Sequence, residues 1–426
     1  MDDNRTHTEK SRARIGMLIT NLGSGGAQRV FHDHTTVFAE SYNGLQIVFD
    51  KEEDKSLFSS PYRLADLRVD DENTVQAKAG PLMRLVSRSR KLKRLVEKEG
   101  LDIVISHMDG ANWVNVLSRS RARKVLVVHG TIMHDKGQHP VMQWLRKKLI
   151  IPFIYNRGDL TVAVSEAIAY EMKHFLGVKN VVAIPNFFDE QAIADMAAAP
   201  LPEEYEKIFS KYKVLINSGR FAEQKQQRHL LPVFRKVLDE EPGTKLFLLG
   251  DGPLRKELVE EAQGLGLRVY HPWDGAGEEV TEDFDVYMPG YLSNPFQFLR
   301  QSTMFLFPSG WEGFPLALCE AMITGIPVLS SDCPTGPREI LSPGTFDASY
   351  SLDEVQPSDY GYLMPMTDKK DFSAAWTATI LNLLRDEDSR KRLGDAARER
   401  AKDFGKEKIE DKWYRIISDQ LKAGNA

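Results

Sequence analysis

Cysteine is scarce in this chain, and no long apolar run interrupts it. Only Cys319 and Cys333 occur in 426 residues, so there is no disulfide framework or cysteine-based metal pattern, and we expect both to be core residues. No segment approaches the run of about eighteen apolar residues that marks a membrane-spanning helix. Residues 1–10 lack the apolar stretch of a secretory signal. These absences predict a protein of the reducing cytoplasm, with a disordered lead-in over residues 1–14.

A complete glycine fingerprint for dinucleotides is also missing. The first apolar strand, expected over 15–20, leads into a glycine-rich turn and a helix expected over 27–39. The spacing departs from G-x-G-x-x-G because Gln28 stands where the third glycine belongs. Gly25 and Gly26 still allow the backbone to approach a ligand closely. An ordinary turn between strand and helix is the alternative.

The chain has the length and pattern of a two-domain α/β protein. Its 426 residues are too many for one ordinary core, and its 42% hydrophobic and 27% charged residues are typical of a soluble globular protein. Short apolar segments alternate with helical patterns, which predicts parallel sheets. Binding sites in such sheets lie at the carboxyl ends of the strands.

Positive charge is concentrated in the first half, although the net charge is −5. Residues 81–124 contain eleven Lys/Arg against four Asp/Glu, a local charge of +7, which suggests an anionic partner. The segments 82–98 and 141–151 are both amphipathic and basic. They fit either ordinary domain helices with solvated outer faces or a surface that rests on anionic lipid.

The most informative stretch lies at 305–332. An apolar strand at 304–307 is followed by a glycine-containing loop, and then by a helix in which Pro315 occupies the first position. The free N–H groups at such a helix start suit a phosphate. Glu312 lies in the loop and Glu320 eight residues later in the helix, so two carboxylates can serve different parts of one ligand. The alternatives are a helix-capping Glu312 and a solvated Glu320.

This stretch resembles the nucleotide-binding signature of the retaining, GT-B-fold glycosyltransferases of group 1. The resemblance rests on the two glutamates together with Pro308-Ser309, Gly313, Glu320-Ala-Met and Gly325-x-Pro-Val. It implies that Glu312 contacts the donor sugar and that Glu320 contacts the nucleotide ribose. It also implies that backbone from Gly313 through Phe314 and Pro315 to Leu316 lies at the donor phosphates.

Two further motifs of the second half carry the same resemblance. Arg220 ends a strand as part of Gly-Arg, and Lys225 follows five residues later. A planar guanidinium and a mobile ammonium suit a diphosphate, and the resemblance implies that this pair binds the donor diphosphate. Gln226 departs from the family pattern, which has glycine after the lysine. The resemblance implies that Gly250, in Gly-Asp-Gly-Pro, lies near the base. An ordinary turn between a strand and a helix is the alternative for this sequence.

In the first half the resemblance is weaker. A glycine-rich loop followed by Gln-Arg matches Gly25 and Gly26 followed by Gln28 and Arg29, which implies a loop over the active cleft. His129 ends a strand where the family carries a histidine that faces the acceptor. His107 ends the preceding strand, and we expect it to be structural.

The resemblance implies two Rossmann-like parallel α/β domains that face an interdomain cleft. We expect an acceptor domain at 15–190, a linker at 191–212, a nucleotide-sugar domain at 213–404, and a C-terminal helix at 405–426 that crosses back to the first domain. An insertion at 268–291 contains Asp283-Phe-Asp. This is formally a D-x-D metal motif, which we interpret as a solvated loop.

The expected activity is retaining transfer of a hexose or N-acetylhexosamine from a nucleotide-diphosphate sugar, with a UDP-linked donor expected. The acceptor would be a glycan or lipid-linked hydroxyl in surface polysaccharide or glycoconjugate synthesis. We expect no cofactor, metal or nucleic acid, and a cytoplasmic protein that can lie peripherally on the inner membrane face. The alternatives are a sugar-nucleotide epimerase of the same fold and a nicotinamide oxidoreductase in which Asp50 holds the ribose.

Overall fold

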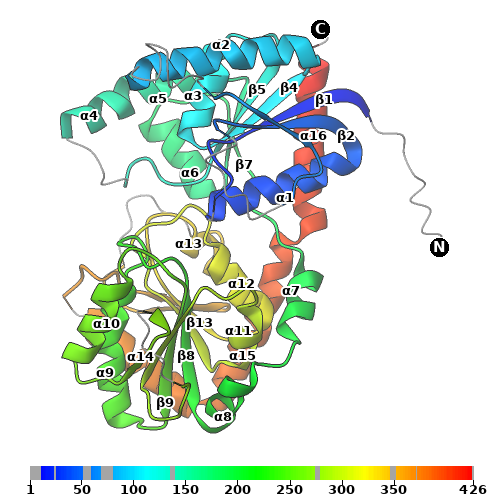
Figure 1. Cartoon of the computed structure of the whole chain (residues 1–426). Helices are drawn as coiled ribbons and strands as arrows, with labels where there is room; N and C mark the ends of the chain where they lie inside the picture. The colour runs from blue at the N-terminus through cyan, green and yellow to red at the C-terminus, as the bar shows by residue number, and fades with distance from the viewer. Residues whose placement is uncertain are drawn as a thin grey trace. The chain divides into compact units, whose positions relative to one another are not determined.

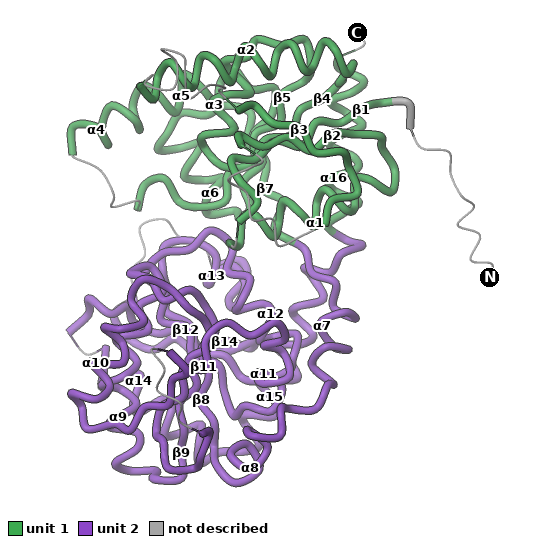
Figure 2. The backbone as a smooth tube through the Cα atoms, viewed as in Figure 1, with its two compact units in different colours: residues 1–186, 409–426 green, residues 187–408 purple. Residues whose placement is uncertain are grey.

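The computed structural model describes residues 11–23, 25–50, 59–68, 80–134, 140–273, 279–345, 352–370 and 372–424. The chain divides into two compact units (Figure 2). Unit 1 comprises residues 1–186 and 409–426, and unit 2 comprises residues 187–408. Of the lead-in expected at 1–14, residues 1–10 lie outside the described residues, and the remainder belongs to the first strand.

Unit 1 is built on a seven-stranded sheet in the described part of the chain, with the strand order β3-β2-β1-β4-β5-β6-β7. All neighbouring strands are parallel. The strands are β1 (Ser11–Leu18), β2 (Tyr42–Val48), β3 (Arg63–Asp66), β4 (Ile103–His107), β5 (Arg123–Val128), β6 (Leu160–Ala163) and β7 (Val181–Ala183). Central strands such as β4 are buried along their whole length, as expected where helices cover both faces of a parallel sheet.

The helices of unit 1 cover both faces of this sheet (Figure 1). α2 packs beside α3, and α16 packs on α1 through contacts of Trp413 with His34 and Phe38. The helices are α1 (Gly26–Ser41), α2 (Pro81–Glu99), α3 (Asp109–Ser118), α4 (Pro140–Leu145), η1 (Arg146–Ile150), α5 (Ile151–Tyr155), α6 (Glu166–Tyr170), η2 (Glu171–Phe175) and α16 (Lys406–Gly424). The last helix therefore returns to the first unit, as predicted.

Unit 2 has an eight-stranded sheet in its described part, with the order β10-β11-β9-β8-β12-β13-β15-β14. Its strands are parallel except for the antiparallel edge pair β14/β15. They are β8 (Lys213–Ser218), β9 (Thr244–Leu249), β10 (Val269–Tyr270), β11 (Val286–Gly290), β12 (Met304–Phe307), β13 (Val328–Ser331), β14 (Gln356–Ser358) and β15 (Gly361–Met364).

The helices of unit 2 surround this sheet and bury a core that includes Trp376, Phe234 and Leu246. They are α7 (Glu190–Ala197), α8 (Glu203–Lys211), η3 (Gln227–His229), α9 (Leu230–Glu240), α10 (Arg255–Gly264), α11 (Phe296–Gln301), α12 (Leu316–Thr324), α13 (Pro337–Leu341), α14 (Phe372–Arg385), α15 (Glu387–Ala401) and η5 (Lys402–Phe404).

Both sheets reverse their strand order at one point, between β1 and β4 in unit 1 and between β8 and β12 in unit 2. Loops that leave adjacent strands in opposite directions open a crevice at such a point, where ligands of α/β proteins bind. Gly25 follows β1, and Arg220 and Glu312 follow β8 and β12, the strands that border these switch points. His129 and Gly250 follow β5 and β9, each one strand farther out.

Two details of the sequence-based organisation are wrong. Residues 191–212 are not a linker, because most of them form α7 and α8, and both helices belong to unit 2. Their burial of Ile193, Tyr205 and Ile208 explains why the segment is ordered. Pro315 is the N-cap residue of α12 rather than its first helical residue.

Candidate active site

The loops that follow β8, β12 and β13 are joined to one another in unit 2. Gln224, after β8, accepts a hydrogen bond at its backbone carbonyl from Gly310 N (2.8 Å) and donates from Nε2 to Trp311 O (2.6 Å). Thr335, after β13, donates from Oγ1 to the backbone carbonyl of Glu312. The loop that carries Glu312 is therefore fixed from both sides.

Lys225 and Glu312 form an ion pair in this arrangement. Lys225 Nζ lies 2.6 Å from Glu312 Oε1, and the Glu312 side chain is only 7% exposed. The ammonium also lies 5.3 Å from the centre of the Phe307 ring. Glu312 does not cap α12, since the hydrogen bond of its carboxylate in the described residues goes to Lys225. The pairing brings together two residues that the sequence placed 87 positions apart.

The first turn of α12 has backbone donors without an acceptor inside the helix. Pro315, its N-cap, is extended (φ −74°, ψ 100°) and provides no side-chain cap. The N–H groups of Leu316 and its two successors have no intrahelical acceptor, and they form the positive end of the helix dipole. Gly336, with φ 93°, lies against Pro315, and an added Cβ there would come within 2.5 Å of Pro315 Cδ. Gly313 and Phe314 lead into this turn, so the predicted phosphate-binding backbone is contiguous.

Glu320 lies on the second turn of α12 and is 8% exposed. The alternative of a solvated surface glutamate is therefore wrong. Its neighbour Cys319 is fully buried, and burial, with a smaller contribution from the Glu320 carboxylate, raises the pKa of that thiol well above its usual range. Cys333 is buried as well, so both cysteines are core residues, as predicted.

Arg220 lies at the end of β8, where the chain packs directly on the turn after β9. Gly250, with φ 140°, approaches so closely that an added Cβ would lie 2.1 Å from Gly219 O. Phe221 N donates to Asp251 O (3.0 Å), which joins the two loops. Gln227 Nε2 donates to the Arg220 carbonyl (3.2 Å), while the Arg220 side chain is exposed. The backbone of Arg220 is thus fixed and its guanidinium faces solvent.

The structure shows how Gln226 is accommodated at a position where the family pattern has glycine. Its φ of 52° lies in the left-handed region, which glycine adopts at no steric cost. Gln226 instead uses its side chain: Thr367 Oγ1 donates to Gln226 Oε1 (2.6 Å). The amide also fills the space beside Gly310, where an added Cβ would lie 2.6 Å from Gln226 Nε2.

In unit 1, Gly25 and Gly26 lie at the start of α1, the helix that follows β1. Gly25 is the extended N-cap residue (φ −172°), and Arg29 N donates to its carbonyl (3.0 Å). Gln28 Nε2 donates to Asn21 Oδ1 (2.8 Å), so the side chain of Gln28 folds back over the turn. Gly25 and Gly26 are both exposed, as a backbone that meets a ligand must be.

His129 follows β5 and contacts a second histidine. Its Nε2 lies 2.9 Å from Nδ1 of His107, which ends β4 and is completely buried. Burial lowers the pKa of His129 to about 4, and burial followed by the nearby His129 lowers that of His107 well below its usual range. His34 of α1 packs on His107 with a ring separation of 5.4 Å. Three neutral imidazoles therefore lie together beside the switch point.

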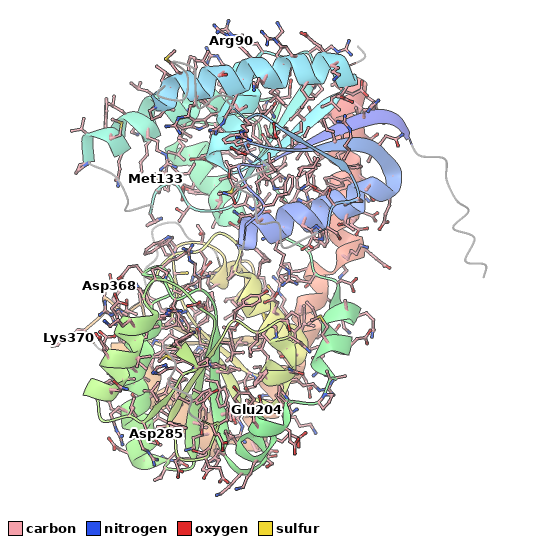
Figure 3. All side chains as sticks on the ribbon, viewed as in Figure 1. Arg90, Met133, Glu204, Asp285, Asp368 and Lys370 are labelled. Carbon is pink, nitrogen blue, oxygen red and sulfur yellow. The ribbon has the colours of Figure 1, made fainter. Side chains whose placement is uncertain are left out.

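The loop after His129 is held by a carboxylate that sequence reasoning missed. Glu171 Oε1 accepts from Ile132 N (2.6 Å) and Met133 N (2.8 Å), and Oε2 accepts from Thr131 Oγ1 (2.5 Å). Lys147 Nζ donates to Met133 O (2.8 Å); Figure 3 labels Met133 in this loop. Burial raises the pKa of Glu171, although its hydrogen bonds oppose this shift.

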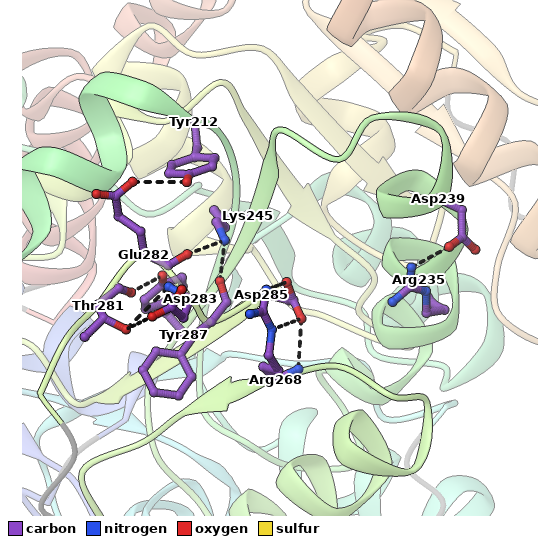
Figure 4. A network of polar contacts seen from close by, with 11 residues as sticks. Tyr212, Arg235, Asp239, Lys245, Arg268, Thr281, Glu282, Asp283, Asp285 and Tyr287 are labelled. Atoms are coloured by element: carbon purple, nitrogen blue, oxygen red, sulfur yellow. Dashed lines mark hydrogen bonds and ion pairs between the residues drawn. The ribbon is translucent and has the colours of Figure 1, made fainter.

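The interpretation of Asp283-Phe-Asp285 as a solvated loop is wrong for Asp285, whereas Asp283 is exposed. Asp285 is 7% exposed and accepts from Arg268 N (2.9 Å) and from its guanidinium (3.1 Å). Figure 4 shows this pair beside a second group around Lys245 and Glu282. Asp285 therefore joins the start of β11 to the residue before β10. Residues 274–278 of the predicted insertion lie outside the described residues.

Comparison with known proteins identifies the family. The model described as "Glycosyl transferases group 1" matches residues 203–400, and that described as "Glycosyltransferase Family 4" matches residues 24–192. An uncharacterized glycosyltransferase of Methanocaldococcus jannaschii is 30% identical over 359 residues, which cover 78% of this chain and 83% of that protein. The chain belongs to the group 1 glycosyltransferases.

Other similar proteins support the same conclusion for this glycosyltransferase. The Campylobacter jejuni N-acetylgalactosamine-N,N'-diacetylbacillosaminyl-diphospho-undecaprenol 4-alpha-N-acetylgalactosaminyltransferase is 22% identical, over 93% of this chain and 97% of that protein. The structure of Anabaena HepE with UDP superposes with a TM-score of 0.71 at 17% identity, over 96% of this chain and all of that one. The fold is therefore GT-B. An oxidoreductase in which Asp50 holds a ribose does not fit this family.

Proposed function

We propose that this glycosyltransferase transfers a hexose or N-acetylhexosamine, with retention, from a UDP-linked donor to a glycan or lipid-linked hydroxyl in surface polysaccharide or glycoconjugate synthesis. The observation that carries the proposal is the Lys225–Glu312 pair, which lies where the loops after β8 and β12 join and just ahead of the uncapped start of α12. The similar Anabaena structure was solved with UDP, and the Campylobacter relative is named for a diphospho-undecaprenol-linked substrate. Both observations support this donor and acceptor class.

In this proposal the Lys225 ammonium interacts with two anions at once, the Glu312 carboxylate and the donor diphosphate. An ammonium has three donors, and one of them is directed to Glu312 in this structure. The other two remain for the donor diphosphate, whose negative charge rises as the glycosidic bond breaks. Arg220 and the N–H groups of Leu316 and its neighbours add further positive charge at the leaving group. We therefore propose that neutralisation of the leaving group requires no metal ion.

In this proposal the two glutamates contact different parts of the donor. Glu320, on the second turn of α12, would accept hydrogen bonds from the ribose hydroxyls, since a carboxylate can receive two side by side. Glu312, held by Lys225, would contact the transferred sugar. Backbone at Gly250 would lie near the base. We assign no protein nucleophile, because in the proposed mechanism the acceptor hydroxyl attacks from the face that the nucleotide leaves.

Unit 1 would bind the acceptor. His129 and the Gly25–Gly26 turn lie at the carboxyl ends of strands near its switch point, the usual place for a ligand. His129 would contact the acceptor hydroxyl or a neighbouring oxygen. Its neutral imidazole places no net charge there.

We further propose that unit 1 rests on anionic lipid at the inner membrane face. Leu82 and Met83 at the start of α2 are 73% and 58% exposed, and Trp144 of α4 is 58% exposed. Exposed cations accompany them on α2, and Figure 3 shows that Arg90 points away from the sheet. Apolar side chains beside cations suit such a surface. No helix in the described residues has the length and apolar character needed to cross a bilayer.

A panel of nucleotide sugars tests the donor. Thermal-shift measurements on the full chain should show stabilisation by UDP and by UDP-hexoses, because a ligand that binds only the folded state raises its melting temperature. Transfer to an acceptor analogue should persist in EDTA. Release of free sugar at the same rate without acceptor would instead indicate a sugar-nucleotide epimerase. Inhibition by EDTA that manganese reverses would refute the metal-free mechanism.

A further inference from the structure

His107 holds the imidazole of His129 by one short contact. The 2.9 Å separation of His107 Nδ1 and His129 Nε2 is a hydrogen-bond distance. The rings lie 28° from parallel. His107 is otherwise surrounded by rings, with Phe31 edge-on at 5.1 Å and His34 at 5.4 Å.

One proton lies between these two nitrogens. A hydrogen bond requires one N–H and one lone pair, so one histidine donates and the other accepts. Burial lowers the pKa of both rings, which keeps them neutral and leaves each with a single N–H. The position of the proton in the pair therefore determines which nitrogen of His129 carries hydrogen at its opposite edge.

The second nitrogen of His107 decides between the two arrangements. His107 Nε2 is buried and has no hydrogen-bond partner within the described part of the chain. If Nδ1 accepted, Nε2 would be a buried N–H without an acceptor. If Nδ1 donates, Nε2 is only a bare lone pair. Unpaired buried donors are rarer in proteins than under-satisfied acceptors, which favours donation by Nδ1.

We propose that His107 donates from Nδ1 to His129 Nε2 and so holds His129 as its Nδ1–H tautomer. The consequence for catalysis rests on the proposed function. His129 would present an N–H to an oxygen of the bound sugar or acceptor, as a hydrogen-bond donor, and would not act as a base. His107 would be a positioning residue, although the sequence suggested only a structural histidine.

The tautomer can be measured directly in the wild type. Two-bond proton–nitrogen correlation spectra of the full chain, labelled with 15N at its ten histidines, distinguish protonated from bare ring nitrogens. Loss of signals in His129→Ala and His107→Asn assigns the two rings. We expect a protonated Nδ1 and a bare Nε2 in His129. The reverse pattern, or a charged His129 ring at neutral pH, would overturn the proposal.

A pair of variants tests the positioning role. His107→Asn places an amide N–H close to the position of Nδ1, whereas His107→Phe fills the space without a donor. We expect His107→Phe to lower transfer about tenfold, the loss of one hydrogen bond of about 1.4 kcal/mol, and His107→Asn to restore most of it. UDP affinity should not change. Equal loss in both variants, or none, would overturn the positioning role.

The spectrum and the activity of the variants test two separate claims, the tautomer of His129 and the role of His129 in transfer. If His129→Ala leaves transfer unchanged, then the role given to His129 in the proposed function is wrong, while the spectrum still tests the tautomer. If His107→Phe does not fold, the wild-type spectrum and His107→Asn remain. Thermal melting of each variant shows whether it is folded.

Discussion

The two units use the same architecture but opposite electrostatics at their sites. The predicted site of unit 2 contains charged side chains: Lys225 contacts Glu312, and the Arg220 side chain, which follows the same strand as Lys225, is exposed. Unit 1 gathers neutral rings, since His34, His107 and His129 are held uncharged by burial. Charges suit a nucleotide diphosphate, whereas neutral donors suit a sugar hydroxyl. The contrast indicates how one chain can divide donor and acceptor chemistry between two similar sheets.

The largest effect should come from unit 2. Arg220→Ala should lower turnover about a hundredfold, because a cation directed at the leaving diphosphate stabilises the transition state more than the ground state. Donor affinity should fall less. Arg220→Lys should recover little, since an ammonium lacks the two-pronged contact. Steady-state kinetics measures these values, with Arg235→Ala as the control, because Arg235 pairs with Asp239 on α9. Near-normal turnover of Arg220→Ala would remove it from the site.

Glu312→Gln should have the next largest effect. The substitution keeps the size of the side chain but removes the charge that Lys225 contacts. Hydrogen bonds to charged groups contribute about 1.5–3 kcal/mol, so turnover should fall by one to two orders of magnitude while UDP binding persists. Single-turnover kinetics together with a UDP titration separates the two quantities. Wild-type turnover would mean that the ion pair only holds the loop.

A smaller effect concerns the surface of unit 1. Replacing the exposed cations Arg84, Arg90, Lys93 and Arg94 of α2 with Ser should weaken binding to anionic liposomes about tenfold, because each contributes up to about 1 kcal/mol and salt screens the attraction. Co-sedimentation measures this. Lys91 is omitted because its ammonium donates to the Arg68 carbonyl. The control replaces Lys236, Lys256, Lys391 and Arg392 of unit 2 with Ser. Equal sedimentation of the wild type and both variants would reject the lipid-facing surface.

The smallest effect should be a loss of stability of unit 1 in mild acid. Burial lowers the pKa of His34 from 6.5 to about 3, so the unfolded chain binds a proton that the folded chain does not. Stability contributed by neutral His34 is complete above about pH 6.5 and decreases as the pH falls toward 3. Between pH 6.5 and 5.5 the loss is about 1 kcal/mol. Hydrogen exchange in peptides of α1 should rise over this interval, and His34→Phe should reduce the rise, while the neutral His107 and His129 continue to contribute to it. An equal rise in the variant would contradict the assignment.

The sequence predicted the candidate site of unit 2 more fully than that of unit 1. Strand β12 was predicted with its exact bounds. Glu312, Lys225 and Arg220 were selected because their motifs resemble those of a known family, and the structure places Lys225 in contact with Glu312. The Lys225–Glu312 contact itself could not be predicted, since it depends on how two loops meet across neighbouring strands.

The candidate site of unit 1 depends on which side chains are buried together, and residue spacing does not encode this. Nothing near His107 indicates that its ring contacts His129, and Glu171 lies 39 residues from Ile132, to which it is bonded. Glu171 begins the π-helical turn η2, a feature that is frequent at functional sites but leaves no clear sequence pattern. The prediction of a linker at 191–212 failed for a related reason. The segment has few apolar residues, but those it has, such as Ile193 and Tyr205, are enough to pack α7 and α8 onto unit 2.

Calorimetric titration of UDP into wild type, Glu320→Ala and His129→Ala tests the division between the units most directly. Glu320→Ala should weaken UDP binding by about 1.5–3 kcal/mol, the value of hydrogen bonds to a charged group. Its control is Glu260→Ala, which removes an exposed glutamate paired with Lys256 in the same unit. His129→Ala should bind UDP as the wild type does and yet transfer sugar more slowly. Unchanged affinity in Glu320→Ala, or an equal fall in affinity and transfer in His129→Ala, would contradict the assignment of the nucleotide to unit 2 and the acceptor to unit 1.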